Sequence, residues 1–237
     1  MGLTKIEWTT YTWNPVTGCK HGCPFCYARR IAERIYPEGF EPTYRPERLT
    51  QPYHWPPGRI FVCSMGELFG DWVPPAWQEA VFKVVRDCPQ HQFLFLTKAP
   101  HNLKKMNPWP QNAWAGASAI NQVMAERAIA GLRETDAPIR FLSCEPLLGP
   151  IDVDLSGLSW LIIGAQTKPY NPPKKRWVEV LLARAAEAGI PVFLKDNLNW
   201  PQRIQEWPDG QGRLHRARAS ACDELSGKGT PRQSRLF

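Results

Sequence analysis

Short apolar runs that alternate with segments of helical periodicity are the feature that most limits the folds open to this chain. The runs are rich in β-branched and aromatic residues and apolar throughout, as is typical of strands buried on both faces. Alternation of such strands with helices predicts repeated β-α units around a parallel sheet. We expect strands at Trp8–Pro15, Arg59–Met65, Gln92–Thr97, Ala113–Ser118, Arg140–Cys144, Trp160–Gly164 and Pro191–Lys195.

Three segments have apolar residues at helical spacing along one side. They are Tyr27–Ile35, Trp77–Cys88 and Val178–Ala186, and the last ends before Gly189. Right-handed crossovers would wind these units into an α/β fold, a full or partial (β/α) barrel with outer helices. The strand-to-helix loops would then meet at one mouth, where we expect the functional residues.

The chain of 237 residues is long enough for one barrel domain, which we place at residues 1–208. The segment 37–58 contains six prolines and little periodicity, which predicts a long ordered insertion. The polar, Gly- and Arg-rich segment 209–237 predicts a flexible basic tail. The sequence gives no indication of an oligomeric state.

Composition limits the compartment and the partners. No apolar run approaches the roughly 20 residues of a membrane span, and the first ten residues lack the pattern of a secretory signal. We therefore expect a soluble, cytoplasmic protein with no membrane partner. The net charge of +7 favours anionic partners such as phosphate esters or nucleic acid. Seven cysteines, an odd number, indicate metal ligation rather than a disulfide framework.

Three of these cysteines lie close together in the segment Gly18–Tyr27. Cys19, Cys23 and Cys26 have the spacing C-x3-C-x2-C, and two glycines and a proline shape a tight loop around them. A 4Fe-4S cluster held by three thiolates leaves one iron open to another ligand. A zinc site that uses His21 or a distant cysteine as its fourth ligand is the competing interpretation, although zinc ligands usually come in two separated pairs.

The cysteine spacing, with an aromatic residue just before the third cysteine, resembles the cluster motif of the radical S-adenosylmethionine (radical SAM) superfamily. Other segments are similar to an uncharacterised phage-protein branch of it, distantly similar to spore photoproduct lyase, and the similarity covers most of residues 4–199. These segments are Ile6–Trp8, Thr12–Pro15, Thr17–Cys19, Phe141–Pro150 and Phe193–Lys195.

The resemblance implies a TIM-barrel-like enzyme that binds a 4Fe-4S cluster through Cys19, Cys23 and Cys26. The open iron would chelate the amino and carboxylate groups of S-adenosylmethionine. An electron from an external donor would then cleave the cofactor reductively, and the resulting 5′-deoxyadenosyl radical would abstract hydrogen from a substrate. The protein would supply orientation and a dry pocket.

The resemblance and the barrel together suggest cofactor-binding residues at the strand ends. Ser64 and Glu67 follow the second strand, where the superfamily carries a Gly-and-acid motif that contacts the methionine amino group; helix capping by Glu67 is the alternative. Lys98 ends the next strand, where an ammonium would pair with the methionyl carboxylate. Its alternative is a surface lysine whose stem covers apolar side chains.

Four more residues are implied in cofactor binding. Ser118 and Asn121 follow another strand and are expected at the ribose hydroxyls, with helix capping as the alternative. Phe25 and Tyr27 flank Cys26, where the superfamily has an aromatic residue that contacts adenine; ordinary packing around the cluster is the competing interpretation.

Three residues are candidates for contact with the reacting groups. Glu145 follows an apolar strand, and because a buried carboxylate is costly without partners, we expect it to contact ribose, sulfonium or substrate. Cys63 and Cys144 lie in two different strands, where a thiol could donate a hydrogen atom; small buried apolar residues are the alternative. Lys195 and Asp196 predict a local salt bridge or a substrate contact.

The substrate stays open between two classes. The segment Thr167–Trp177 combines basic and aromatic residues, which suits phosphate contact and base stacking, but a solvated Pro-rich loop explains it equally well. The chain is therefore expected to act on nucleic acid or a nucleotide, or alternatively on a peptide or small metabolite. A zinc-stabilised nucleic-acid-binding module without catalysis is the alternative from another class.

Overall fold

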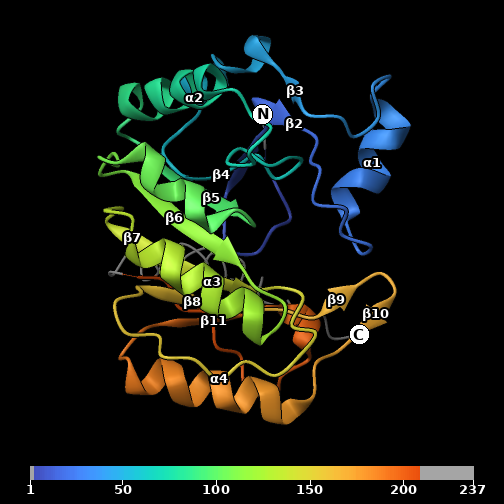
Figure 1. The fold of residues 1–237 in the computed structure, drawn as a ribbon, viewed down its shortest axis with the longest axis vertical. Coiled ribbons are helices and arrows are strands. Elements are labelled where there is room, and N and C mark those ends of the chain that lie inside the picture. The colour runs from blue at the N-terminus through green and yellow to red at the C-terminus, as the bar shows by residue number, and fades with distance from the viewer. Residues whose placement is uncertain (1–2, 209–237) are drawn as a thin grey trace, which may run out of the picture.

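The computed structural model describes residues 3–208, which form a mixed α/β fold around one large parallel sheet (Figure 1). The sheet has seven strands in the order β1-β4-β5-β6-β7-β8-β11 and curls into a half-barrel with β1 and β11 at its edges. The barrel is therefore partial. The strands are β1 (Tyr11–Trp13), β4 (Arg59–Val62), β5 (Gln92–Thr97), β6 (Ala113–Ser118), β7 (Ile139–Cys144), β8 (Trp160–Ile163) and β11 (Val192–Leu194).

All seven predicted strands are present, and five of them differ from the prediction at their ends: four are shorter, and β7 begins one residue earlier, at Ile139. The predicted helices are present as α1 (Tyr27–Ile35), α2 (Pro75–Asp87) and α4 (Lys175–Glu187). The sequence interpretation missed α3 (Gln122–Arg133), three of whose five buried residues are alanine or glycine, so that it lacks a strong apolar stripe. Among the described residues no helix is long and apolar enough to cross a membrane.

The connections carry short elements of their own. The Pro-rich segment 37–58 contains β3 (Thr43–Tyr44), η1 (Pro46–Arg48) and η2 (Gln51–His54), and β3 pairs with β2 (Val16–Thr17). Elsewhere lie η3 (Pro100–Met106), η4 (Asp196–Leu198) and a hairpin of β9 (Gln166–Thr167) and β10 (Tyr170–Asn171). The predicted tail 209–237 lies outside the described residues.

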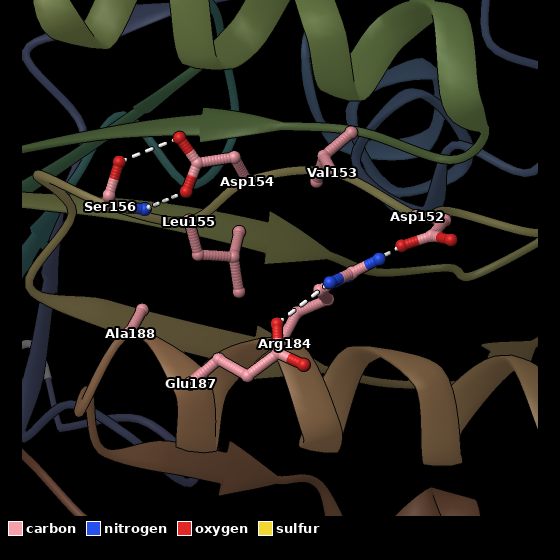
Figure 2. Close-up of a pocket in the computed structure, with 8 residues that line it drawn as sticks. All are labelled: Asp152, Val153, Asp154, Leu155, Ser156, Arg184, Glu187 and Ala188. Carbon is pink, nitrogen blue, oxygen red and sulfur yellow. Dashed lines mark hydrogen bonds and ion pairs between the residues drawn. The ribbon is translucent and has the colours of Figure 1, made fainter.

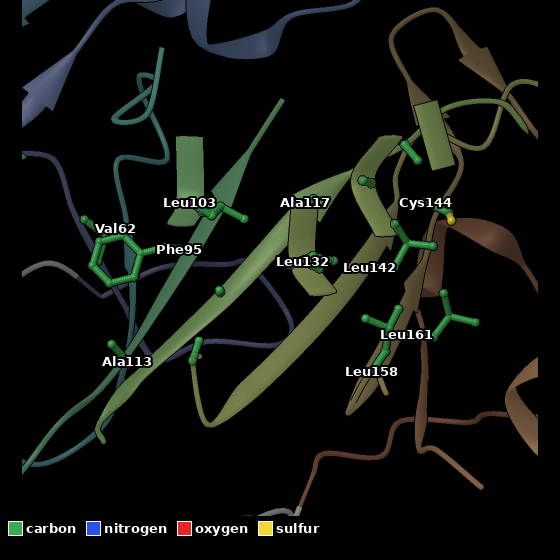
Figure 3. Packing of buried hydrophobic residues seen from close by; sticks show 14 of the residues in the cluster. Val62, Phe95, Leu103, Ala113, Ala117, Leu132, Leu142, Cys144, Leu158 and Leu161 are labelled. Atoms are coloured by element: carbon green, nitrogen blue, oxygen red, sulfur yellow. The ribbon is translucent and has the colours of Figure 1, made fainter. Parts of the chain in front are cut away.

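Side chains on the outer face of the sheet pack against the helices. Figure 3 shows part of this cluster, in which Phe95 lies beside Val62 and Leu142 of β7 lies near Leu132 of α3. Strand residues alternate between the two faces, so neighbours in sequence belong to different clusters. The outer cluster therefore receives every second residue of each strand.

The inner face of the half-barrel is filled by large rings. They belong to a second cluster made of Trp8, Phe61, Leu94, Trp114, Phe141, Trp160, Ile162 and Phe193. Nearer the carboxyl ends of the strands the inner positions hold small residues, among them Gly116, Ser118, Ser143 and Gly164. Large rings below and small side chains above leave space at the carboxyl ends of the strands.

Candidate functional site

A cavity of about 440 Å³ lies above these small residues, in the size range of small-molecule sites. It lies at the carboxyl ends of the strands, the side on which α1 and the β9–β10 hairpin project in Figure 1. The structure brings eleven of the thirteen predicted site residues to its wall: Cys19, Cys23, Phe25, Cys26, Tyr27, Cys63, Ser64, Glu67, Lys98, Ser118 and Glu145. Residues that end or follow β4, β5, β6 and β7 therefore meet the cysteine loop at one cavity.

The cysteine loop is fixed by its glycine and by its helix. Gly18 has a φ of +86°, and a Cβ at this position would lie 2.1 Å from the carbonyl oxygen of Glu41, so only glycine fits. Cys26 caps α1, because its Sγ accepts a hydrogen bond of 3.4 Å from the backbone N–H of Arg29. Burial raises the pKa of Cys19 to about 11. The loop therefore delivers all three thiols to the cavity wall.

The donor chemistry of this loop suits an iron–sulfur cluster, since cysteine thiolates are the usual ligands of such clusters. Within residues 3–208, however, no group of three or more His, Cys, Asp and Glu side chains is placed to hold a metal ion together. Cys19, Cys23 and Cys26 line one cavity without converging on one point. Binding a cluster would require the loop to draw the thiols together.

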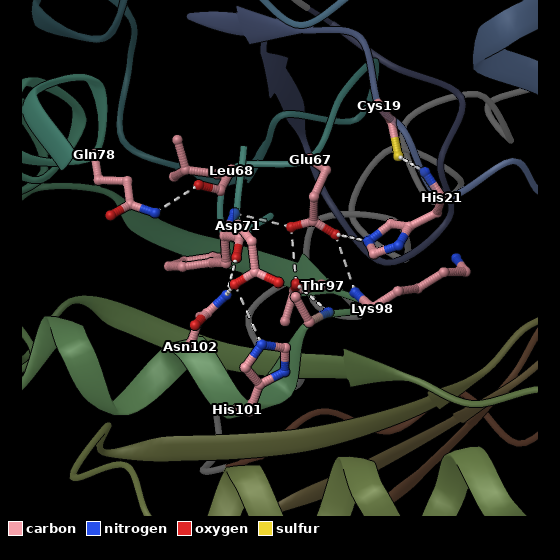
Figure 4. Close-up of polar contacts among 12 residues, drawn as sticks. Cys19, His21, Glu67, Leu68, Asp71, Gln78, Thr97, Lys98, His101 and Asn102 are labelled. Atoms are coloured by element: carbon pink, nitrogen blue, oxygen red, sulfur yellow. Dashed lines mark hydrogen bonds and ion pairs between the residues drawn. The ribbon is translucent and has the colours of Figure 1, made fainter. Parts of the chain in front are cut away.

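Glu67 joins the cysteine loop to the sheet (Figure 4). It is buried, and its two carboxylate oxygens accept four hydrogen bonds, from His21 Nε2 at 3.0 Å, Lys98 N at 3.0 Å, Phe69 N at 2.9 Å and Thr97 Oγ1 at 2.8 Å. Burial raises the pKa of Glu67, but these donors outweigh it, so the pKa lies below its usual value. Glu67 is therefore a fully bonded carboxylate.

These contacts differ from both roles expected for Glu67, which were helix capping and contact with the methionine amino group. It does not cap α2, whose first residues are preceded by Pro74 without a side-chain cap. Its oxygens are also already occupied by protein donors, one of them His21, which lies between Cys19 and Cys23 in the sequence. The His21 ring further packs edge-on against Trp72, with ring centroids 5.0 Å apart. Glu67 thus positions the cysteine loop.

Tyr27 and Ser64 connect the start of α1 to the end of β4. The Tyr27 hydroxyl donates to the backbone oxygen of Ser64 at 2.7 Å. Ser64 in turn donates through Oγ to Asn14 Oδ1 at 3.2 Å. Lys98 lines the same part of the cavity, and no ion pair involving its ammonium occurs among the described residues.

Glu145 and Lys195 form an ion pair on the cavity wall. They come from the ends of β7 and β11, fifty residues apart, and their side chains are 25% and 14% exposed. The predicted pair between Lys195 and Asp196 is wrong, because Asp196 lies instead near Arg203 and its backbone N–H donates to Glu7 Oε2 at 2.8 Å. Lys195 therefore faces the cavity, which the sequence interpretation did not favour.

Two predicted residues do not reach the cavity. Cys144 lies on the outer face of β7 and packs in the outer cluster beside Leu142 and Leu161 (Figure 3). Asn121 caps α3, because its Oδ1 accepts the backbone N–H of Met124 at 3.1 Å. By contrast, Cys63 lines the cavity, and burial raises its pKa to about 12.

Two residues that the sequence interpretation did not select lie on the cavity wall with unpaired polar atoms. Ser143 Oγ and Trp8 Nε1 are buried and have no hydrogen-bond partner within the described part of the chain. Strand alternation is the signal that could have found Ser143, since it shares the inner face of β7 with Phe141.

The basic segment after β8 is ordered differently from the predicted loop. It forms the β9–β10 hairpin, in which Gln166 and Thr167 line the cavity, and then the start of α4. Lys174 precedes the helix, with its ammonium 5.5 Å from the ring centroid of Trp177. Lys174 and Lys175 therefore lie at the start of α4, rather than in the extended loop that the sequence predicts.

A second cavity, of about 350 Å³, lies between residues 152–156 and α4 (Figure 2). Its charged groups are paired with one another, Arg184 with both Asp152 and Glu187, while Asp154 accepts from Ser156. These pairs are exposed, so they contribute little and leave no unmet polar group for a ligand. We assign it no function.

No curated protein and no solved structure gives a match to the sequence. One family model, described as protein of unknown function (DUF5131), matches residues 3–228. The match includes the cysteine loop, the seven strands of the sheet and the whole wall of the larger cavity. The chain belongs to the DUF5131 family.

Proposed function

We propose that this chain is a radical SAM enzyme whose larger cavity holds a 4Fe-4S cluster on Cys19, Cys23 and Cys26, with S-adenosylmethionine beside it. The observation that carries the proposal is that three thiols from one short loop line a single cavity together with the strand-end residues. When bound, these groups would supply one-electron cleavage of the sulfonium and a 5′-deoxyadenosyl radical able to take hydrogen from a substrate.

The chain's own residues would hold and shield the cofactors. Lys98 places an ammonium at the cysteine side of the cavity, where it would pair with the methionyl carboxylate. Glu67 and His21 would keep the loop against the sheet. The inner ring cluster closes the space beneath the cavity, which would keep water from a reactive intermediate.

Cys63 is the hydrogen-atom donor that the geometry supports, whereas Cys144 is not proposed for this role. The Cys63 thiol lines the cavity, and its raised pKa of about 12 keeps it protonated at neutral pH. A protonated thiol is the form that carries a hydrogen atom. Cys63→Ala should therefore leave cofactor cleavage intact and alter only the fate of the substrate radical.

The test is formation of 5′-deoxyadenosine by the anaerobically reconstituted, reduced protein in the presence of S-adenosylmethionine. We expect slow formation without substrate and none from the Cys19→Ala variant. Absence of the product from a preparation with full iron and sulfide content would contradict the enzymatic proposal and favour a binding or sensing role.

A further inference from the structure

The unpaired polar atoms of the cavity floor point to a ligand. Ser143 is 1% exposed and Trp8 3% exposed, and neither Ser143 Oγ nor Trp8 Nε1 has a partner within residues 3–208. A buried hydroxyl or indole N–H without a hydrogen bond is costly, so such groups are rare unless something outside the chain satisfies them. Both residues line the same cavity.

The two residues lie on the same inner surface. Ser143 follows Phe141 by two positions on β7, so both side chains face inward. Trp8 lies against this face, with its ring centroid 6.5 Å from that of Phe141 and 4.7 Å from that of Phe61. Phe61 also lines the cavity. The floor therefore combines aromatic rings with two unmet hydrogen-bonding groups.

The two carboxylates of the wall already have partners, which narrows the class of ligand. Glu145 is paired with Lys195, and Glu67 is saturated by its four donors. Lys98 lies beside Glu67, on the cysteine side of the cavity. What the floor still lacks is an acceptor for the indole N–H and a partner for the hydroxyl. An uncharged ligand supplies both without leaving a buried charge unpaired.

We infer that the floor around Ser143 and Trp8 binds the nucleobase of the substrate. A nucleobase is flat and uncharged, so it fits against the rings of Trp8 and Phe61, and it carries ring nitrogens or carbonyls that accept hydrogen bonds. This inference rests on the proposed function only in placing the cofactor at the cysteine side, near Phe25 and Tyr27. It names the substrate class as nucleosides or nucleic acid rather than peptides.

The experiment is calorimetric titration of the anaerobically reconstituted full chain, saturated with S-adenosylmethionine, with each of the four common ribonucleosides and with a neutral dipeptide. We expect at least one nucleoside to bind and the dipeptide not to bind. Ser143→Ala and Trp8→Phe should each weaken nucleoside binding about tenfold, the effect of one lost hydrogen bond. Both variants should keep the iron and sulfide content of the parent, which shows that they fold and load normally.

Trp114→Phe is the matched control. Its indole N–H belongs to the same ring cluster but donates to Gln92 Oε1 at 3.1 Å, and the residue does not line the cavity. Nucleoside affinity should therefore be unchanged in this variant, and an equal loss in Trp114→Phe and Trp8→Phe would contradict a specific contact.

Three results would overturn the inference. The first is that none of the four nucleosides binds, and the second is that Ser143→Ala and Trp8→Phe leave nucleoside affinity unchanged. The third is simple competition between nucleoside and S-adenosylmethionine, because this would show that the floor binds the adenine of the cofactor. If the radical SAM proposal is wrong but the floor does bind a nucleobase, the result differs. The protein would then lack iron or form no 5′-deoxyadenosine, while nucleoside binding that depends on Ser143 would persist.

Discussion

Two buried polar sites on one cavity wall are built in opposite ways. Glu67, at the cysteine side, is a carboxylate with four protein donors, whereas Ser143, at the floor, has a hydroxyl without a partner in the described chain. The first arrangement is complete without a ligand and holds a loop in place. In the second arrangement the described residues supply no hydrogen-bond partner for the Ser143 hydroxyl. Glu67 thus holds the cysteine loop against the sheet without a ligand, whereas the floor is left for what binds.

The largest effect should come from the cysteine side. Replacing any one of Cys19, Cys23 or Cys26 by Ala should abolish stable cluster binding, because in the proposed site each thiolate would hold a different iron. Iron and sulfide content after anaerobic reconstitution measures this. Cys88→Ala is the matched control, since Cys88 is buried in the outer cluster and should leave both contents unchanged. Full iron content in all three single variants would contradict the proposal that this loop binds the cluster.

Glu67→Gln sharpens the comparison at the level of stability. An amide keeps one acceptor but turns an NH₂ group toward donors that the carboxylate now satisfies. We expect the free energy of unfolding to fall by about 3 kcal/mol, as for removal of one partner of a buried charged network. Denaturant unfolding of the apoprotein gives this value. A change below about 1 kcal/mol would show that the hydrogen bonds of Glu67 contribute little.

The small residues above the ring layer should be the next most sensitive. A Cβ on Gly116 would lie 2.2 Å from the ring of Phe141, which is fully buried and has no room to move. Gly116→Ala should therefore cost about 2 kcal/mol of stability through overpacking. Gly149→Ala, whose added Cβ would meet Asn121 at an ordinary 3.4 Å, is the control and should change stability much less. Equal effects would argue against a tightly packed floor.

The pH dependence of stability distinguishes the buried Glu67 from the partly buried Glu7. Because the folded protein lowers the pKa of Glu67 from 4.5, this carboxylate contributes stability above pH 4.5 and loses it as the pH falls below that value. The stability difference between the parent and Glu67→Gln should therefore shrink in acid. Glu7 behaves oppositely, because burial raises its pKa, so its contribution is lost as the pH rises above 4.5. Unfolding curves of Glu67→Gln and Glu7→Gln, each compared with the parent across this pH range, give the two opposite signs.

The smallest effect is expected at Ser143. Since its hydroxyl has no partner within the described residues, Ser143→Ala should change the free energy of unfolding by less than about 0.5 kcal/mol or raise it slightly. The measurement is the same unfolding experiment without ligand. A loss comparable to that of Glu67→Gln would show that the hydroxyl is bonded in the apoprotein, and the contrast between the two sites would disappear.

The sequence predicted the sheet well and the site less completely. Continuous apolar runs identify strands such as β5 and β6 to the residue, but the same continuity hides which side chains face inward. For this reason Cys144 was selected and its inward neighbour Ser143 was not. The pairing of Lys195 with Glu145 joins strand ends fifty residues apart and depends on how the sheet curls, which local patterns do not specify.

The most direct test of the account is the metal content of the anaerobically reconstituted full chain. The account predicts a brown protein with broad visible absorption and about four iron and four sulfide ions per chain. A colourless protein that retains stoichiometric zinc on the same cysteines, without iron or sulfide, would contradict the radical SAM proposal and support a zinc-stabilised binding module.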